Sequence, residues 1–152
     1  MRSKVFNLGG IAGSIVMRAH HVQVRVRYSE TDQMGVVYHG NYIPYFEIGR
    51  VEWLRNKGVS YKELEESGIA LPIVSLTLNY KKPARYDDLL NVKTVFKSQS
   101  SVKIEFDCEI TNDKNELLTT AYFLLVFVDI KTGRPTAPPK HILELLEKVE
   151  NE

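Results

Sequence analysis

Residues 42–56 carry the sequence YIPYFEIGRVEWLRN, whose apolar side chains surround most of a predicted helix. Pro44 falls in the first turn, where its missing N–H has no intrahelical bond to lose, and Gly58 lies just beyond the end. Asn41 precedes the helix, and we expect its side-chain oxygen to cap a free amide of the first turn. A helix with so little polar surface is normally buried. The sequence therefore predicts a central helix that the rest of the chain covers.

Gly49 lies in the middle of this predicted helix. A glycine there costs about 1 kcal/mol relative to alanine, so a compensating contact is expected. We predict that another backbone approaches the helix closely at Gly49.

Alternation of apolar and polar residues predicts the strands of a sheet. The first strand begins at His21 and extends to Tyr28. Four more strands follow the helix, at residues 74–80, 90–97, 102–110 and 119–130. The last is apolar on both faces, which is typical of a strand inside a sheet. A short helix at residues 60–67 and a C-terminal helix complete the pattern, the latter with an apolar stripe of Ile142, Leu145, Leu146 and Val149.

These elements predict an α+β fold in which a five-stranded antiparallel sheet curls around one long helix. A length of 152 residues fits one domain, which we assign to residues 19–152. Residues 1–18 are expected to be an N-terminal extension of unknown role. This segment superficially resembles a secretory leader, but its three glycines argue against that interpretation, and Met17 is an alternative start.

Composition excludes several classes of protein. The chain has 20 basic and 19 acidic residues, so a nucleic-acid protein held by a basic face is not expected. A single cysteine excludes an internal disulfide framework and suits a reducing cytoplasm. The longest apolar run, residues 121–128, is far shorter than the roughly 20 residues of a membrane-spanning helix. We therefore expect a cytoplasmic protein without membrane insertion.

Common catalytic and ligand-binding motifs are absent from the sequence. It contains no dinucleotide or P-loop glycine motif, no His-Glu-x-x-His and no Gly-x-Ser-x-Gly. The four histidines lack zinc-binding spacing, and His20 and His21 are expected to be a solvated pair. Cys108 lies in the apolar phase of its strand, so we expect it in the core. No metal site is predicted.

Chemistry-bearing residues are concentrated between Tyr28 and Glu47. Asp32 lies seven residues before His39, which is close to the amino end of the predicted central helix. Free amides and the positive end of the helix dipole would stabilise an oxyanion there. From spacing alone, a turn or capping role for Asp32 and a structural role for His39 remain open.

Residues 28–42, YSETDQMGVVYHGNY, followed by Phe46-Glu47 and Arg50, resemble the signature of hotdog-fold thioesterases. The most similar groups are the 4-hydroxybenzoyl-CoA thioesterases and the YbgC-like acyl-CoA thioesterases. A second block, from Tyr80 to Asp88, resembles the segment between that family's second and third strands. The resemblance covers residues 20–148. It implies a hotdog fold in which two protomers pair their sheets edge to edge, with active sites at the interface, and in which dimers often form tetramers.

The resemblance also implies catalytic roles by position. Asp32 matches the catalytic carboxylate, which attacks the thioester carbonyl as a nucleophile or activates a water. The backbone amide of His39 matches the donor to the thioester oxygen, and its side chain matches the histidine of the YbgC-like branch. Glu47 is interpreted as a structural hydrogen-bonding residue.

Substrate-binding residues are less sharply defined. Coenzyme A phosphates are usually bound by surface lysines and arginines, although each such residue is also an ordinary solvated charge. No cofactor is implied, because coenzyme A is part of the substrate. The expected acyl-pocket and substrate-binding residues are Tyr38, Asn41, Tyr42 and Phe46, and the expected phosphate-binding residues are Lys81, Lys82, Arg85 and Lys97.

The sequence therefore predicts an acyl-CoA thioesterase acting on a short-chain or aromatic acyl group. Two alternatives are a hotdog hydratase or dehydratase and a non-catalytic hotdog module that binds an acyl thioester or a protein. Fold alone does not distinguish them, because one fold carries many activities.

Overall fold

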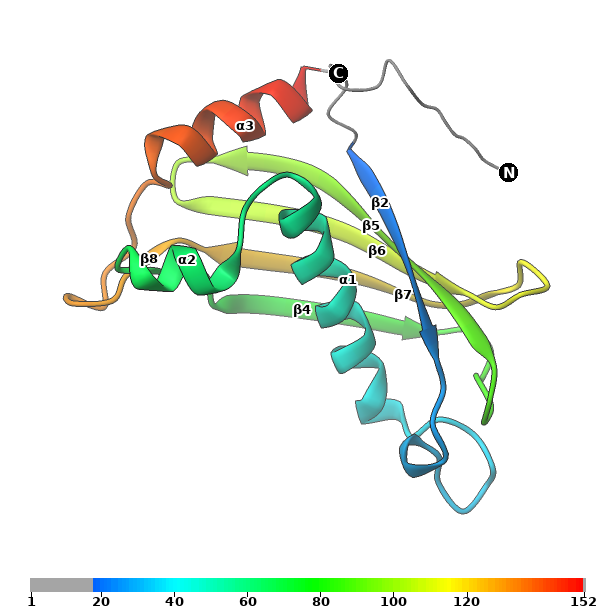
Figure 1. Ribbon diagram of the computed structural model, residues 1–152. Helices are drawn as coiled ribbons and strands as arrows, with labels where there is room; N and C mark the ends of the chain where they lie inside the picture. The colour runs from blue at the N-terminus through cyan, green and yellow to red at the C-terminus, as the bar shows by residue number, and fades with distance from the viewer. Residues whose placement is uncertain (1–17, 152) are drawn as a thin grey trace.

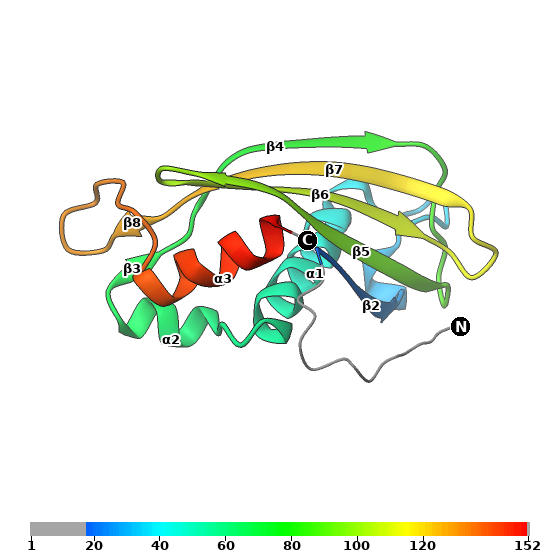
Figure 2. The same ribbon diagram turned by 90° about the horizontal axis from the view of Figure 1, so that it is seen from above.

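The computed structural model describes residues 18–151, in which a curved antiparallel sheet packs against helices on one of its faces (Figures 1 and 2). The five strands run in the order β2-β5-β6-β7-β4, and every neighbouring pair is antiparallel. This confirms the predicted α+β class. The strands are β2 (Ala19–Arg25), β4 (Ile73–Tyr80), β5 (Leu89–Ser100), β6 (Lys103–Thr111) and β7 (Leu117–Val126), and the helices are α1 (Tyr42–Asn56), α2 (Tyr61–Glu66) and α3 (Lys140–Glu150).

Strand order differs from the simplest arrangement of consecutive neighbours. β4 and β5 follow one another in the chain, but β4 lies at the edge of the sheet beside β7. The connection between β4 and β5 therefore crosses the end of the sheet. This crossing brings residues 81–88 to the beginning of α1.

Two predicted strands end earlier in the structure. β2 ends at Arg25, and Tyr28 instead begins the 3-10 turn η2 (Tyr28–Glu30). β7 ends at Val126, and the following residues form β8 (Val128–Asp129), which pairs with β3 (Ile69–Ala70) in a separate two-stranded sheet. The apolar run continues through this break, so hydropathy alone does not predict it.

α1 occupies residues 42–56 as predicted and lies against the concave face of the sheet (Figure 1). Trp53 is fully buried, and its ring lies 5.8 Å from that of Phe96 and 5.1 Å from that of Phe106. The opposite side of the helix is not covered, because Ile43 is 37% and Ile48 42% exposed. Within the described chain, the central helix is therefore buried on one face only.

The close contact at Gly49 involves side chains of β5 and not a backbone, which corrects the prediction. A Cβ on Gly49 would lie 2.7 Å from Val92 Cγ1 and 2.8 Å from Thr94 Oγ1. Cys108 is buried as expected, and burial raises the pKa of its thiol to about 12.

The predictions for residues 1–17 lie outside the described residues. Arg18, which we had assigned to the extension, is bound to the domain. Its guanidinium donates to the carbonyls of Phe96 and Glu150, and its own carbonyl accepts a 2.7 Å hydrogen bond from Trp53 Nε1.

Candidate active site

Two loops meet at the amino end of α1. The loop between β2 and α1 is joined to the connection between β4 and β5 by backbone hydrogen bonds. Val37 N donates to Ala84 O at 2.9 Å, and Val26 N donates to Asp88 O at 2.9 Å. The loop that carries Asp32 is therefore fixed against the connection between β4 and β5.

Asp32 is half-buried in a tight turn of the first loop. Its Oδ1 accepts a 2.8 Å hydrogen bond from Met34 N, and its backbone N–H donates to Val36 O at 2.8 Å. Gly35 closes the turn with a φ of +78°, a conformation that favours glycine. Asp32 Oδ2 accepts no hydrogen bond from residues 18–151. One carboxylate oxygen is thus held by the loop, and the other is available to a ligand.

The beginning of α1 supplies backbone donors. The 3-10 turn η3 (His39–Asn41) leads directly into the helix, and the leading amides of such a turn lack partners within it. Among the described residues, the amides of His39 and Gly40 donate to no group outside η3 and α1. These N–H groups and the positive end of the helix dipole favour a bound oxyanion.

Asn41 does not cap α1 as predicted. Its backbone is already helical, with φ −81° and ψ −6°, and its side chain makes no capping hydrogen bond. Instead, Asn41 Nδ2 donates to Glu30 O at 2.8 Å. The residue therefore ties η3 to the loop that carries Asp32.

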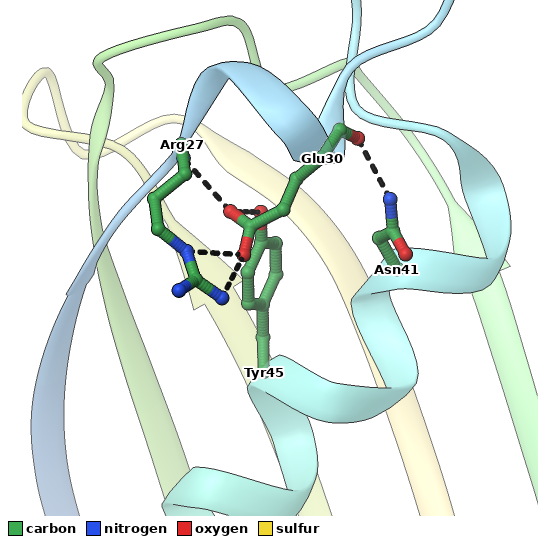
Figure 3. Close-up of polar contacts among 4 residues, drawn as sticks. All are labelled: Arg27, Glu30, Asn41 and Tyr45. Atoms are coloured by element: carbon green, nitrogen blue, oxygen red, sulfur yellow. Dashed lines mark hydrogen bonds and ion pairs between the residues drawn. The ribbon is translucent and has the colours of Figure 1, made fainter.

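Glu30 is at the centre of this arrangement, as Figure 3 shows. Its Oε1 accepts 2.8 Å hydrogen bonds from Arg27 N and Tyr45 Oη, and its Oε2 accepts from Arg27 Nε at 3.0 Å. Partial burial raises the pKa of Glu30, but the hydrogen bonds from Arg27 and Tyr45 outweigh it and leave the pKa lowered. Burial, together with the bond to Glu30, raises the pKa of Tyr45. Sequence reasoning missed these two residues, because neither their spacing nor their type marks a site.

A cavity of about 260 Å³ lies beside these groups and is lined by Val37, His39, Tyr42, Tyr80, Lys81, Lys82 and Pro83. Tyr80 Oη donates to His39 O at 3.0 Å, and the Tyr80 and Tyr42 rings meet edge to face at 5.5 Å. Three of the seven lining residues, His39, Tyr42 and Tyr80, therefore present aromatic rings to the cavity, and two others are lysines. Tyr80 and Pro83 were in the second sequence block but had not been chosen as site residues.

Tyr42 lines the cavity and is hydrogen-bonded to the connection between β4 and β5. Its hydroxyl oxygen accepts a 3.0 Å hydrogen bond from Ala84 N, so its own proton is free to donate to another group. Burial raises the pKa of Tyr42 and outweighs the hydrogen bond from Ala84 N, which lowers it; Tyr80, Asp88 and, least of all, Asp32 add to the rise. The hydroxyl therefore stays protonated at the cavity wall.

Comparison with known proteins identifies the family. The family model described as the thioesterase-like superfamily matches residues 26–146. The chain belongs to this superfamily. This confirms the resemblance predicted from the sequence, and the sheet wrapped on α1 is the hotdog fold.

Individual relatives of this thioesterase agree with that assignment. It is 38% identical over 120 residues to the acyl-CoA thioester hydrolase YbgC of Escherichia coli, covering 79% of this chain and 90% of that protein. It is 36% identical over 138 residues to a chloroplastic acyl-acyl carrier protein thioesterase of Arabidopsis thaliana, covering 90% and 71%. A solved DHNA-CoA thioesterase from Staphylococcus aureus superposes with a TM-score of 0.81 at 34% identity, covering 88% of this chain and 89% of that one. The chain is therefore a thioester hydrolase, and the comparisons favour neither a hydratase nor a non-catalytic module.

The structure brings some of the predicted site residues of this thioesterase together. His39, Tyr42, Lys81 and Lys82 line the cavity, and the Tyr38 ring lies against that of His39 with centroids 4.3 Å apart and a tilt of 40°. Lys82 Nζ also forms a 2.9 Å ion pair with Glu116, in the turn between β6 and β7. The cavity lining therefore combines the predicted aromatic and basic residues.

Other predicted residues lie elsewhere. Phe46 is fully buried against Phe123, one turn deeper along α1, and Arg85 is exposed on the loop beside Val36. Lys97 is eight residues along β5 from Leu89, or about 26 Å for an extended strand. Its ammonium lies 5.1 Å from the Tyr122 ring. The structure does not bring Lys97 to the cavity.

No group of three or more His, Cys, Asp or Glu residues with metal-binding geometry occurs among residues 18–151. None of the helices in this part of the chain has the length and apolar character needed to cross a membrane.

Proposed function

We propose that the chain hydrolyses acyl-CoA thioesters and that Asp32 and the amides at the start of α1 perform the chemistry. The observation that carries this proposal is that three features occur at the amino end of α1: a half-buried carboxylate with one oxygen free of hydrogen bonds from residues 18–151, helix-start amides without an acceptor outside η3 and α1, and a cavity lined by His39 and Tyr42. Acyl transfer needs a nucleophile or base on one side of a carbonyl and N–H donors for the oxyanion on the other. The similarity to YbgC, named as an acyl-CoA thioester hydrolase, supports this choice of substrate class.

Two routes use the same residues. In the first, Asp32 attacks the thioester carbon, coenzyme A leaves as a thiolate, and water hydrolyses the resulting mixed anhydride. In the second, Asp32 removes a proton from a water that attacks the same carbon. In both routes the carbonyl oxygen becomes negative and is stabilised by the amides of His39 and Gly40. Hydrolysis in ¹⁸O-labelled water under single-turnover conditions distinguishes the routes, because the anhydride route can leave label in the Asp32 carboxylate.

The cavity suggests which acyl groups fit. The cavity of about 260 Å³ is bordered by His39, Tyr42 and Tyr80, and these rings favour an aromatic or short acyl group. The name of the Staphylococcus aureus neighbour, a DHNA-CoA thioesterase, supports an aromatic substrate. Lys81 and Lys82 line the cavity, and we expect their ammonium groups to contact the phosphates of coenzyme A.

We also propose that the protein acts as a homodimer, or as a tetramer of paired dimers, joined through β4. This edge strand is largely exposed, including Val74 at 60% and Tyr80 at 51%. An exposed edge with apolar side chains is a template for pairing with another strand. Because Tyr80 also lines the cavity, pairing there would complete the site. Light scattering should give a multiple of the chain mass, with Val74→Asp shifted towards monomer.

The deciding experiment follows thiol release over a panel of aromatic and aliphatic acyl-CoAs. We expect turnover by the native chain and a loss of about a hundredfold or more in kcat for Asp32→Asn. Asp113→Asn, in the exposed turn between β6 and β7, is the matched control and should retain activity. Near-normal turnover by Asp32→Asn, or no hydrolysis of any acyl-CoA, would refute the proposal.

A further inference from the structure

We propose that Glu30 is a positioning residue that sets the distance between the Asp32 loop and the amides at the start of α1. This rests on the proposed roles of Asp32 and the helix-start amides. Glu30 itself does not face the cavity, so its effect on catalysis must pass through other groups.

The backbone of Glu30 holds η3. Its carbonyl oxygen accepts two hydrogen bonds, from Tyr38 N at 3.0 Å and from Asn41 Nδ2 at 2.8 Å. These donors stand on either side of His39 and Gly40, whose amides are the proposed oxyanion donors. One carbonyl therefore fixes both ends of the short segment that carries those amides.

The side chain of Glu30 joins α1 to the segment that follows β2 by hydrogen bonds. Its carboxylate accepts from Tyr45 Oη on the helix and from the backbone and guanidinium of Arg27 (Figure 3). Tyr45 is only 2% exposed, and the Glu30 side chain is 15% exposed. Hydrogen bonds to an ionised carboxylate are short and stronger than neutral ones, particularly where water is partly excluded.

Asp32 follows Glu30 by two residues, and the link between them is stiff. Thr31 N and Thr31 Oγ1 both donate to Tyr28 O, at 3.1 and 2.7 Å, and Thr31 pairs with Val37 across the loop. A shift of Glu30 relative to α1 is therefore transmitted to Asp32. Displacement of a catalytic group by about 1 Å can reduce a rate by about a hundredfold.

The same type of contact occurs elsewhere and provides a control. On β6 and β7, Glu105 accepts hydrogen bonds from Tyr122 Oη and, at 2.6 Å, from Ser98 Oγ. The bonds from Ser98 and Tyr122 lower the pKa of Glu105, so this carboxylate is also ionised. The two Tyr–Glu pairs are chemically alike, but none of these control residues is hydrogen-bonded to η3 or to the loop that carries Asp32.

The experiment measures kcat and KM for an acyl-CoA substrate with Glu30→Ala, Glu30→Gln and Tyr45→Phe, beside Glu105→Ala and Tyr122→Phe. We expect Glu30→Ala to lower kcat about 30-fold with KM within about twofold, because geometry and not binding is lost. Glu30→Gln should recover most of the rate, since its amide oxygen still accepts from Tyr45. Tyr45→Phe should lower kcat about fivefold, and the two control variants should change it less than about twofold.

A double-mutant cycle separates positioning from a general loss of structure. In the Asp32→Asn background, Glu30→Ala should lower the residual rate by no more than about twofold, because residues that act through one another are not additive. An additive loss would overturn the proposal, as would a normal kcat for both Glu30→Ala and Tyr45→Phe. If Glu30→Ala does not fold, Tyr45→Phe decides the question. Near-normal activity of Asp32→Asn would instead refute the proposed function, so the two failures are distinguishable.

Discussion

Replacing Gly49 by alanine tests the packing of α1 on the sheet. On helix propensity alone, Gly49→Ala should stabilise the protein by about 1 kcal/mol. The structure predicts the opposite, because the new Cβ would lie 2.7 Å from Val92 Cγ1 and 2.8 Å from Thr94 Oγ1. Both neighbours are fully buried β-branched residues of β5, whose χ1 rotamers are restricted.

The expected magnitude follows from two opposing terms. Overpacking a core costs typically 1–3 kcal/mol, and two contacts against rigid neighbours place Gly49→Ala at about 3 kcal/mol. Subtracting the propensity gain leaves a net destabilisation of about 2 kcal/mol. For a protein of this size, that lowers Tm by about 4–8 °C.

Urea and thermal unfolding at one fixed protein concentration measure this change. Val92→Ala provides the matched test, because it removes Cγ1 and makes room for the added methyl. In a double-mutant cycle, the two substitutions should couple favourably by at least about 1 kcal/mol. A Gly49→Ala protein that is more stable than the native one, with no coupling to Val92, would refute the packing inferred here.

Three further predictions concern single groups. Because burial raises the pKa of Cys108 to about 12, native protein at pH 8 should resist iodoacetamide and react only after unfolding; rapid labelling seen by mass spectrometry would contradict this. The pKa of Glu30 is lowered from its usual 4.5 when the chain folds, so its contribution to stability is complete above about pH 4.5 and is lost as pH falls through the folded value. Denaturant unfolding between about pH 3 and pH 7 should therefore show a shallower acid loss for Glu30→Gln than for the native protein, and equal slopes would argue against it. Lys81→Ala should raise KM about threefold or more for a coenzyme A thioester but not for a pantetheine thioester, with kcat little changed; equal effects on both substrates would exclude a phosphate contact.

The elements of the fold could be predicted because their signals are local. The apolar circumference of residues 42–56 predicted α1, and two-residue alternation together with one continuous apolar run predicted the five strands of the main sheet. The end of β7 at Val126 could not be predicted, because the apolar run continues beyond it and only pairing with Ile69–Ala70 breaks the strand. The exposure of the outer face of α1 could not be predicted either, since hydropathy shows which side chains are apolar and not which residues cover them.

The candidate site divides in the same way. Asp32 and His39 are recognisable from a short motif, in which seven residues of chain separate the carboxylate from the helix start. The predicted capping role of Asn41 was wrong. An N-cap prediction considers only the first turn of the helix, whereas the side-chain amide of Asn41 donates to the carbonyl of Glu30, eleven residues earlier. Lys97 was chosen for its charge alone, and the length of β5 carries it away from the cavity.

Sequence alone determined the family, the central helix and the position of the candidate carboxylate, because each depends on side chains a few residues apart. Tertiary structure decided which groups surround that carboxylate. Tyr80, at the end of β4, meets the carbonyl of His39 across 41 residues, and Glu30 meets Tyr45 across 15 where the loop after β2 packs on α1. Such contacts depend on the order of the strands and on the path of the loops between them, neither of which can be predicted from the spacing of residues along the chain.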